Sequence, residues 1–445
     1  MSWARELGNV GRELFGPSEE AALPPEPLPN ELLLATSGGA NQPVYGEPAA
    51  LEEHVPGGGG PSGAAHRVPG GGVSALHHLE ADLLLVGTEA GAVLAYQLHP
   101  SAAADDGSWD RCEPLGAAAV ARAAVAQIAT AGAAASHAFV LCGGALVALR
   151  HALRQQPPLL ERASALPIGK VLAMAVRAPS EGSSLAEAGA AATVCAATAG
   201  AVLVYTFNGA DAGGALSPRQ HFQLRSHVAL PAALPAVRSL CWAGDEALVV
   251  ADGAQRLQWA SLPPAPLHNA EVLPEEARLE PLLAPSESPA SSSGCALALR
   301  VTPSEVLLVG GGAHTAVVAV GVPHGRRTRR VGYLQGPPAR NATLAWPHLL
   351  CATGSTLRVF DLQLGSLAQS LKLAAPPAPR ASSASASSSS SSAAASRSLR
   401  VSAFGRHELV LARGDVLFTL APLAATEAQG ERRWLRKVSE RPWDA

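Results

Sequence analysis

Residues 83–98, LLLVGTEAGAVLAYQL, carry the pattern that decides the fold. Two apolar runs, Leu83–Val86 and Val93–Tyr96, flank a short break at Thr88–Gly91. Glycine tolerates the positive φ that tight hairpin turns require, so the break predicts a turn. Both arms are apolar almost throughout, which is typical of strands that are covered on both faces. The stretch therefore predicts a β-hairpin.

The hairpin pattern recurs along the chain, and its first arms begin near residues 83, 138, 193, 247, 306, 349 and 408. One hairpin in every ~40 to 60 residues is typical of a β-propeller, in which each repeat forms a four-stranded blade. Short strand-like runs precede most of the hairpins, at Val73–Leu79, Val171–Val176, Ala236–Trp242, Ala342–Trp346 and Leu399–Phe404. The sequence thus predicts an all-β fold, a seven-bladed β-propeller. The inner strand of the fifth blade has two candidates, Leu279–Leu283 and Ala296–Val301.

The propeller is expected to occupy residues 43–422, between two tails. Residues 1–42 are rich in Pro, Gly and Glu, which predicts a disordered N-terminal tail. Residues 374–398 contain a run of serines and predict a disordered loop between blades six and seven. Residues 423–445 are expected to form a C-terminal tail in which a helical segment begins.

Ala49–Val55 is the predicted closing strand of the ring. Pairing of this strand with the last blade would remove a free sheet edge. The Gly-rich stretch Pro56–Gly72 is then expected to act as a linker across the rim.

Bulk composition excludes some classes of function. The formal net charge is only −3, which argues against bulk nucleic-acid binding. The six cysteines include no CxxC pair, and Cys142, Cys195 and Cys351 occupy equivalent positions on their hairpins. We expect them to be buried, reduced and cytosolic, without disulfides or a metal site. The N-terminus has no continuous apolar signal-peptide core, and no apolar run reaches the roughly 18 residues that span a membrane, so a soluble protein is expected.

No catalytic, cofactor or metal motif is evident in the sequence. GxSxG, HExxH and GxxxxGK[ST] are all absent. His77 and His78 are neighbours on a predicted strand, so they should point to opposite faces and cannot share a metal ion. A propeller enzyme would need ionisable groups gathered around the central channel, whereas the predicted inner strands are mostly apolar or small. We therefore expect a non-enzymatic protein without cofactors.

The one clear charge feature is a basic cluster formed by Arg326, Arg327, Arg329 and Arg330. It follows the fifth hairpin, where a loop leads into an outer strand. One interpretation is that the charges only protect a blade edge from pairing with another chain. The other is that the arginine cluster contacts acidic lipid headgroups or an acidic partner surface.

The ordered blade patterns resemble the citron-homology (CNH) domain at the N-terminus of a vacuolar-sorting family. That family includes the vacuolar protein sorting-associated protein 39 and TGF-beta-receptor-associated types, which are subunits of the HOPS and CORVET tethering complexes. The resemblance is carried by Val73–Leu79 with Leu83–Tyr96, by Val237–Trp242, by Arg278–Pro285 (RLEPLLAP) with Val306–Gly310, by Pro347–Phe360 with Gly365–Leu373, and by Glu408–Pro422. It implies a CNH-type propeller.

The resemblance also implies a function in intracellular protein transport and vesicle fusion. The chain would be an interaction module, cytoplasmic and peripheral on endosome and vacuole (lysosome) membranes. Its expected partners are a small Rab-type GTPase, other tethering-complex subunits and the membrane surface. The alternative is a GTPase-binding CNH adaptor of another signalling pathway. Members of the family continue into an α-solenoid of clathrin type, so the chain is expected to be a fragment of such a subunit, the product of a truncated gene model or a stand-alone propeller.

Overall fold

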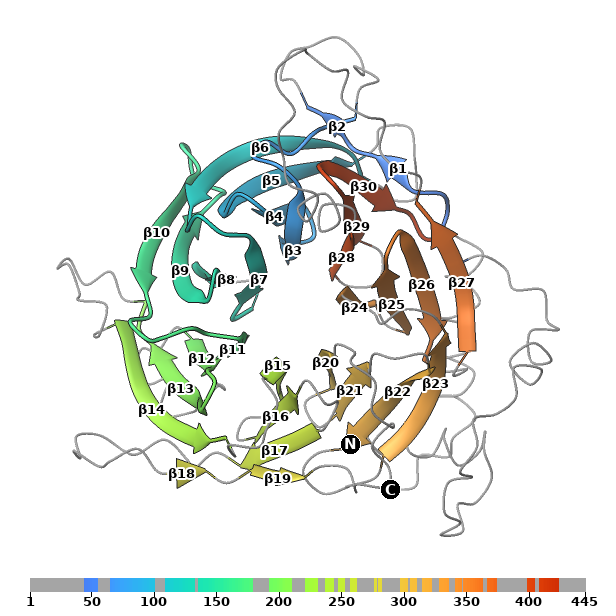
Figure 1. The fold of residues 1–445 in the computed structure, drawn as a ribbon. Helices are drawn as coiled ribbons and strands as arrows, with labels where there is room; N and C mark the ends of the chain where they lie inside the picture. The colour runs from blue at the N-terminus through green and yellow to red at the C-terminus, as the bar shows by residue number, and fades with distance from the viewer. Residues whose placement is uncertain are drawn as a thin grey trace, which may run out of the picture.

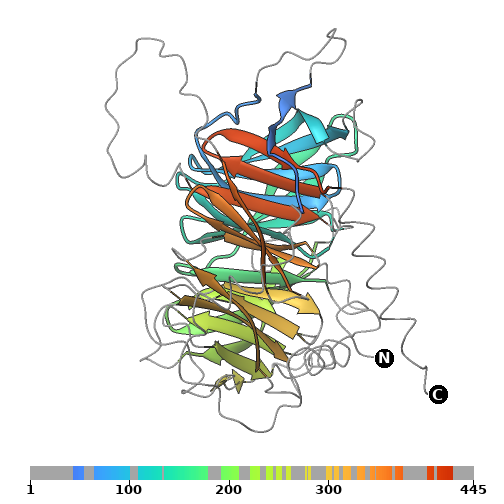
Figure 2. The same ribbon diagram turned by 90° about the vertical axis from the view of Figure 1, so that its right-hand side faces the viewer.

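The computed structural model describes residues 44–54, 65–100, 109–132, 135–178, 192–209, 221–230, 237–243, 247–252, 257–261, 276–277, 279–281, 297–302, 305–309, 314–321, 328–335, 341–345, 347–362, 366–373, 398–404 and 408–423. Every element named in these ranges is a β-strand. The strands form seven sheets of four or five strands each. The sheets are arranged around a common axis (Figure 1), and from the side they form a disk that is thinner than it is wide (Figure 2).

The first three sheets follow one another along the chain, and each is a meander of antiparallel strands. The first contains β3 (Val73–Glu80), β4 (Leu83–Thr88), β5 (Ala92–Pro100) and β6 (Trp109–Ala119). The second contains β7 (Val125–Thr130), β8 (His137–Cys142), β9 (Ala145–Ala152) and β10 (Leu159–Ala165). The third contains β11 (Ala173–Arg177), β12 (Ala192–Ala197), β13 (Ala201–Phe207) and β14 (Phe222–Ala229), with β18 (Glu276–Ala277) added parallel to β14.

The remaining sheets repeat this plan. The fourth contains β15 (Val237–Trp242), β16 (Ala247–Asp252), β17 (Leu257–Ser261) and β19 (Leu279–Pro281). The fifth contains β20 (Leu297–Thr302), β21 (Glu305–Val309), β22 (His314–Gly321) and β23 (Thr328–Gln335). The sixth contains β24 (Asn341–Ala345), β25 (His348–Thr353), β26 (Thr356–Asp361) and β27 (Ser366–Lys372). The seventh contains β28 (Leu399–Phe404), β29 (Glu408–Arg413) and β30 (Val416–Leu420).

The hydrophobic core lies between neighbouring sheets, which we call blades. One cluster joins the first two blades and includes Leu85, Val93, Val140 and Val147. Equivalent clusters join the second blade to the third and the third to the fourth. Because each hairpin is covered by a blade on either side, both arms are apolar, as in Leu83–Thr88, which is buried along its whole length. The predicted all-β propeller is confirmed.

An N-terminal segment, residues 44–54, closes the ring and is called the closing segment below. Its first strand, β1 (Ala49–Ala50), pairs antiparallel with β30 of the last blade. Its second strand, β2 (Glu52–Glu53), pairs parallel with β6 of the first blade. The predicted closing strand is therefore present, but it divides between the two blades on either side of the junction (Figure 1).

The observed pairing decides between the two candidates for the inner strand of the fifth blade, and it revises one further expectation. Leu297–Thr302 is the inner strand of the fifth blade, whereas Leu279–Pro281 is the outermost strand of the fourth. The predicted linker is partly paired, since Ala65 bridges to Glu52 and Arg67 to Val416. The predicted N-terminal tail, almost all of the Ser-rich loop and nearly all of the C-terminal tail lie outside the described residues.

Candidate functional site

The arginine cluster predicted from the sequence is placed only in part. Arg329 and Arg330 lie on the backbone of β23, where they pair with Ala319 and Val318 of β22. Arg326 and Arg327 lie outside the described residues. Since β23 is the outermost strand of the fifth blade, Arg329 and Arg330 lie at a sheet edge. Contact of these arginines with lipid or an acidic partner stays a prediction.

Polar side chains on the innermost strands link one blade to the next. His77 on β3 hydrogen-bonds to the Thr130 hydroxyl of β7 at 3.0 Å. His78 on the same strand hydrogen-bonds to the Ser402 hydroxyl of β28, also at 3.0 Å. The two imidazoles thus point to opposite neighbouring blades, as predicted from strand alternation.

Similar cross-links continue around the axis. Gln127 on β7 donates to the Met174 carbonyl of β11 at 3.0 Å. The Arg177 guanidinium lies over the Trp242 ring, 4.2 Å from its centroid. The Ala298 amide donates to the Ser239 hydroxyl at 3.1 Å, and the Val401 amide donates to the side-chain oxygen of Asn341 at 2.8 Å. These side chains add to backbone hydrogen bonds between neighbouring blades, such as the Val73 amide to the Gly414 carbonyl and the Leu399 amide to the Gly354 carbonyl. The blades of the ring are thus cross-linked at the innermost strands.

The buried His78–Ser402 pair has the residue types of a nucleophile and its base. Burial, with a smaller contribution from His77, lowers the pKa of His78 to about 3. A general base operates best with a pKa near the working pH, and this imidazole is far from that range. Ser402 is itself buried, at 7% exposure. The pair therefore serves to hold β3 against β28 rather than to activate a hydroxyl.

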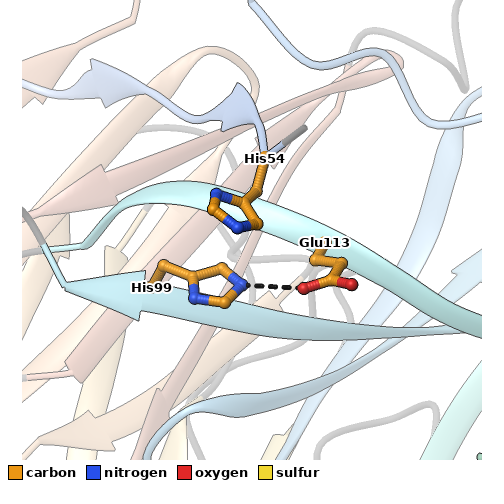
Figure 3. Close-up of side chains that lie close together, drawn as sticks. All are labelled: His54, His99 and Glu113. Atoms are coloured by element: carbon orange, nitrogen blue, oxygen red, sulfur yellow. Dashed lines mark hydrogen bonds and ion pairs between the residues drawn. The ribbon is translucent and has the colours of Figure 1, made fainter. Parts of the chain in front are cut away.

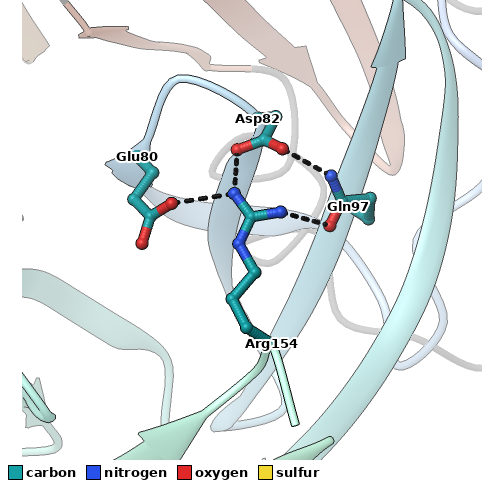
Figure 4. Close-up of polar contacts among 4 residues, drawn as sticks. All are labelled: Glu80, Asp82, Gln97 and Arg154. Atoms are coloured by element: carbon teal, nitrogen blue, oxygen red, sulfur yellow. Dashed lines mark hydrogen bonds and ion pairs between the residues drawn. The ribbon is translucent and has the colours of Figure 1, made fainter. Parts of the chain in front are cut away.

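An ion-pair network at the surface links the first two blades (Figure 4). Arg154 follows β9 and donates to Asp82 at 2.5 Å and to Glu80 at 2.8 Å. Gln97 donates to the second oxygen of Asp82 at 2.7 Å. Partial burial alone would raise the pKa of Asp82, but the hydrogen bonds from Arg154 and Gln97 lower it overall. Because Arg154 is half exposed, solvent screens this network, and it aligns the blades more than it stabilises them.

A second surface cluster brings together two histidines and a glutamate that sequence reasoning did not connect. His54 ends the closing segment, His99 lies on β5 and Glu113 on β6 (Figure 3). His99 Nε2 is 3.2 Å from Glu113 Oε2, and the rings of His54 and His99 are 4.2 Å apart between centroids. All three residues are partly buried. No local sequence pattern predicts the cluster, because the pairing of β2 with β6 brings His54 to the other two residues.

The five cysteines in the described ranges are buried. Cys142, Cys195 and Cys351 are each no more than 1% exposed, as the repeat positions predicted. Burial raises the pKa of the Cys351 and Cys112 thiols to about 12, so neither forms a reactive thiolate at neutral pH. The cysteines of the described ranges are free thiols. Across those same ranges, no helix combines the length and the apolar character needed to cross a bilayer.

Three kinds of comparison were made with known proteins. No protein-family model matches the chain, and no curated protein matches it either. Among solved structures, the chain is similar to the WD40 β-propeller domain of Doa1, with a TM-score of 0.51 and 10% identity over 86% of this chain and 99% of that one. It also aligns with the CNH domain of AfRom2, with a TM-score of 0.46 and 12% identity over 81% of this chain and 97% of that one. At such identities the likeness to the Doa1 domain shows the propeller fold alone.

Proposed function

We propose that the chain is a protein-interaction scaffold, the CNH-type propeller of a vesicle-tethering subunit at endosomal or vacuolar membranes. The observation that carries the scaffold role is the closed, cross-linked ring. Its inner strands use their polar side chains to bind neighbouring blades, as with His78 and Ser402. The edges and loops of the disk then remain as the surfaces on which partners can bind.

The role in vesicle tethering is proposed from the sequence resemblance to CNH domains of tethering subunits. By that resemblance the partner is a small Rab-type GTPase or a membrane-bound protein. The arginine cluster supplies positive charge toward such a partner, and two of its members, Arg329 and Arg330, lie on the outermost strand of the fifth blade. Complementary charge at the rim of an interface raises the association rate and makes binding sensitive to salt.

A panel of purified GTPases tests this proposal. The full chain is immobilised, and Rab-type and Rho-type GTPases are presented in turn with GDP or a non-hydrolysable GTP analogue. We expect nucleotide-dependent binding of at least one Rab-type GTPase. Binding of Rho-type GTPases alone would instead support an adaptor in another signalling pathway, and no binding by any GTPase contradicts the GTPase-binding role.

The arginine cluster is tested with a matched pair of double variants. Arg329→Gln/Arg330→Gln should weaken GTPase binding about tenfold, equivalent to about 1.4 kcal/mol, and should reduce its salt dependence. Arg122→Gln/Arg162→Gln removes the same charge from exposed positions near the first two blades and should bind as the wild type does. Equal affinities for the two variants would exclude the cluster as a contact. Sedimentation with vesicles containing anionic lipid separates a membrane contact from a protein contact.

A further inference from the structure

We propose that His54, His99 and Glu113 form a binding site for a divalent transition-metal ion such as zinc, and that the ion fastens the closing segment to the first blade. The nearest ligand atoms of the three side chains all lie within 4.8 Å of one another. Two imidazoles and one carboxylate are a ligand set that suits zinc, with water in the fourth position. This proposal does not depend on the function proposed above.

Strand pairing builds the site from two parts of the chain. His99 pairs with Arg111 and Gln97 pairs with Glu113 across β5 and β6. Because side chains alternate along a strand, His99 and Glu113 lie on the same face as diagonal neighbours.

The closing segment supplies the third ligand. Glu53 pairs with Cys112 in the parallel ladder between β2 and β6. The amide of His54 then donates to the Cys112 carbonyl at 2.9 Å, which fixes the backbone of His54 beside Glu113. Two ligands thus belong to the first blade, and one belongs to the segment that closes the ring.

One ring must turn for all three ligands to reach a single ion. The planes of the His54 and His99 rings are inclined by only 32°, so they are almost stacked. The lone pairs of imidazole nitrogens lie in the ring plane, and stacked rings therefore do not direct them at a common point. The torsion that turns an imidazole about its Cβ–Cγ bond is broad, so binding would require the His54 ring to turn until a nitrogen points at the ion shared with His99 Nε2 and Glu113 Oε2.

The ion would strengthen a junction whose strand ladders are short. Only two residue pairs join β1 to β30, and only two join β2 to β6. A metal bridge from His54 to His99 and Glu113 adds a cross-link at the far end of the closing segment. Metal binding should therefore protect the amides next to His54 from exchange with solvent.

Direct metal titration tests the site. The full chain is prepared without an affinity tag and with Cys295→Ser, which removes the cysteine that lies outside the described residues. After treatment with chelator, Zn²⁺ binding is measured by calorimetry and Co²⁺ binding by its absorption bands. We expect one ion per chain, with at least ~10-fold weaker binding in each of His54→Gln, His99→Gln and Glu113→Gln. His227→Gln removes a partly buried histidine from β14 and should bind zinc as the parent does.

Hydrogen exchange supplies the second readout. Zinc should slow exchange of the amides of Leu51 and His54 in the parent and leave them unchanged in His99→Gln. Circular dichroism of each variant verifies that it is folded. Absence of stoichiometric binding in the parent, or equal zinc affinity in the parent and in His54→Gln, would overturn the proposal.

Discussion

At the level of single residues, Gly91 has a position that no other amino acid can take without strain. It ends the first hairpin turn with a φ of 84°, in the region that favours glycine. A Cβ atom there would come within 2.5 Å of the Ala123 carbonyl oxygen and closer still to that of Ala121. The turn therefore packs tightly against the connection between the first and second blades.

Gly91→Ala should destabilise the protein by more than about 2 kcal/mol, because it adds a clash with backbone to the cost of positive φ. The matched control is Gly354→Ala in the turn of the sixth blade. Gly354 has a φ of 61°, but nothing lies within 4 Å of the added Cβ. Gly354→Ala should lower the free energy of unfolding, measured with urea, by only about 1 kcal/mol. Equal losses for the two variants would show that the first turn does not pack closely.

His78 makes the stability of the ring depend on pH. Its pKa is about 3 in the folded protein and returns to its ordinary value of 6.5 on unfolding, so between these values the unfolded chain binds more protons. Its contribution to stability is complete above pH ~6.5 and declines toward acid, by about 1.4 kcal/mol per pH unit.

Urea unfolding at several pH values measures this contribution. His78→Asn cannot take up the proton, so its stability should fall with decreasing pH less steeply than that of the wild type. Ser402→Ala is the control, since it removes the hydrogen-bond partner but leaves the imidazole to titrate. It should lower stability while keeping the wild-type slope. A wild-type slope in His78→Asn would refute the assignment.

At the level of elements, the strands that could be predicted from the sequence are those that are buried along their whole length. The first hairpin arms Leu83–Thr88, His137–Cys142 and Ala192–Ala197 are buried along their whole length, so they are apolar runs followed by a turn. The outer strands β6, β10 and β14 are only partly buried, and their patterns are irregular. The inner strand Val125–Thr130 was not recognised, because it is short and mixes polar residues such as Gln127 with apolar ones.

Pairings between distant segments were harder to predict. The closing segment contributes strands of only two residues each, too short for a periodic signal. Its register against β6 brings His54 to Glu113, and only the folded chain reveals that neighbourhood. The links from His77 and His78 to other blades likewise depend on the closure of the ring. The opposite directions of these two imidazoles followed from strand alternation alone, and the structure confirms them.

At the level of the whole molecule, the closing segment crosses three blades. The Tyr45 amide donates to Gln369 of the sixth blade at 2.8 Å, and the Gly46 amide donates to Ala421 after the seventh at 2.9 Å. Leu51 then inserts between the last and first blades, where it is completely buried with Leu84 and Leu417. The closing segment thus joins the sixth, seventh and first blades, and it adds to the direct link between His78 and Ser402.

Leu51→Ala should therefore destabilise the junction between the first and last blades more than the loss of one side chain suggests. Truncation of a buried leucine to alanine lowers the free energy of unfolding by about 2–5 kcal/mol. Leu51 lies at the junction of the first and last blades, which are not consecutive along the chain. Hydrogen exchange should accelerate first in β30 and β6, which flank the junction, and later in the third and fourth blades. Leu367→Ala on β27, where the side chain is 40% exposed, should change stability by less than about 0.5 kcal/mol. If exchange in Leu51→Ala rises equally in every blade, the ring opens as one cooperative unit, and the junction is not its weakest point.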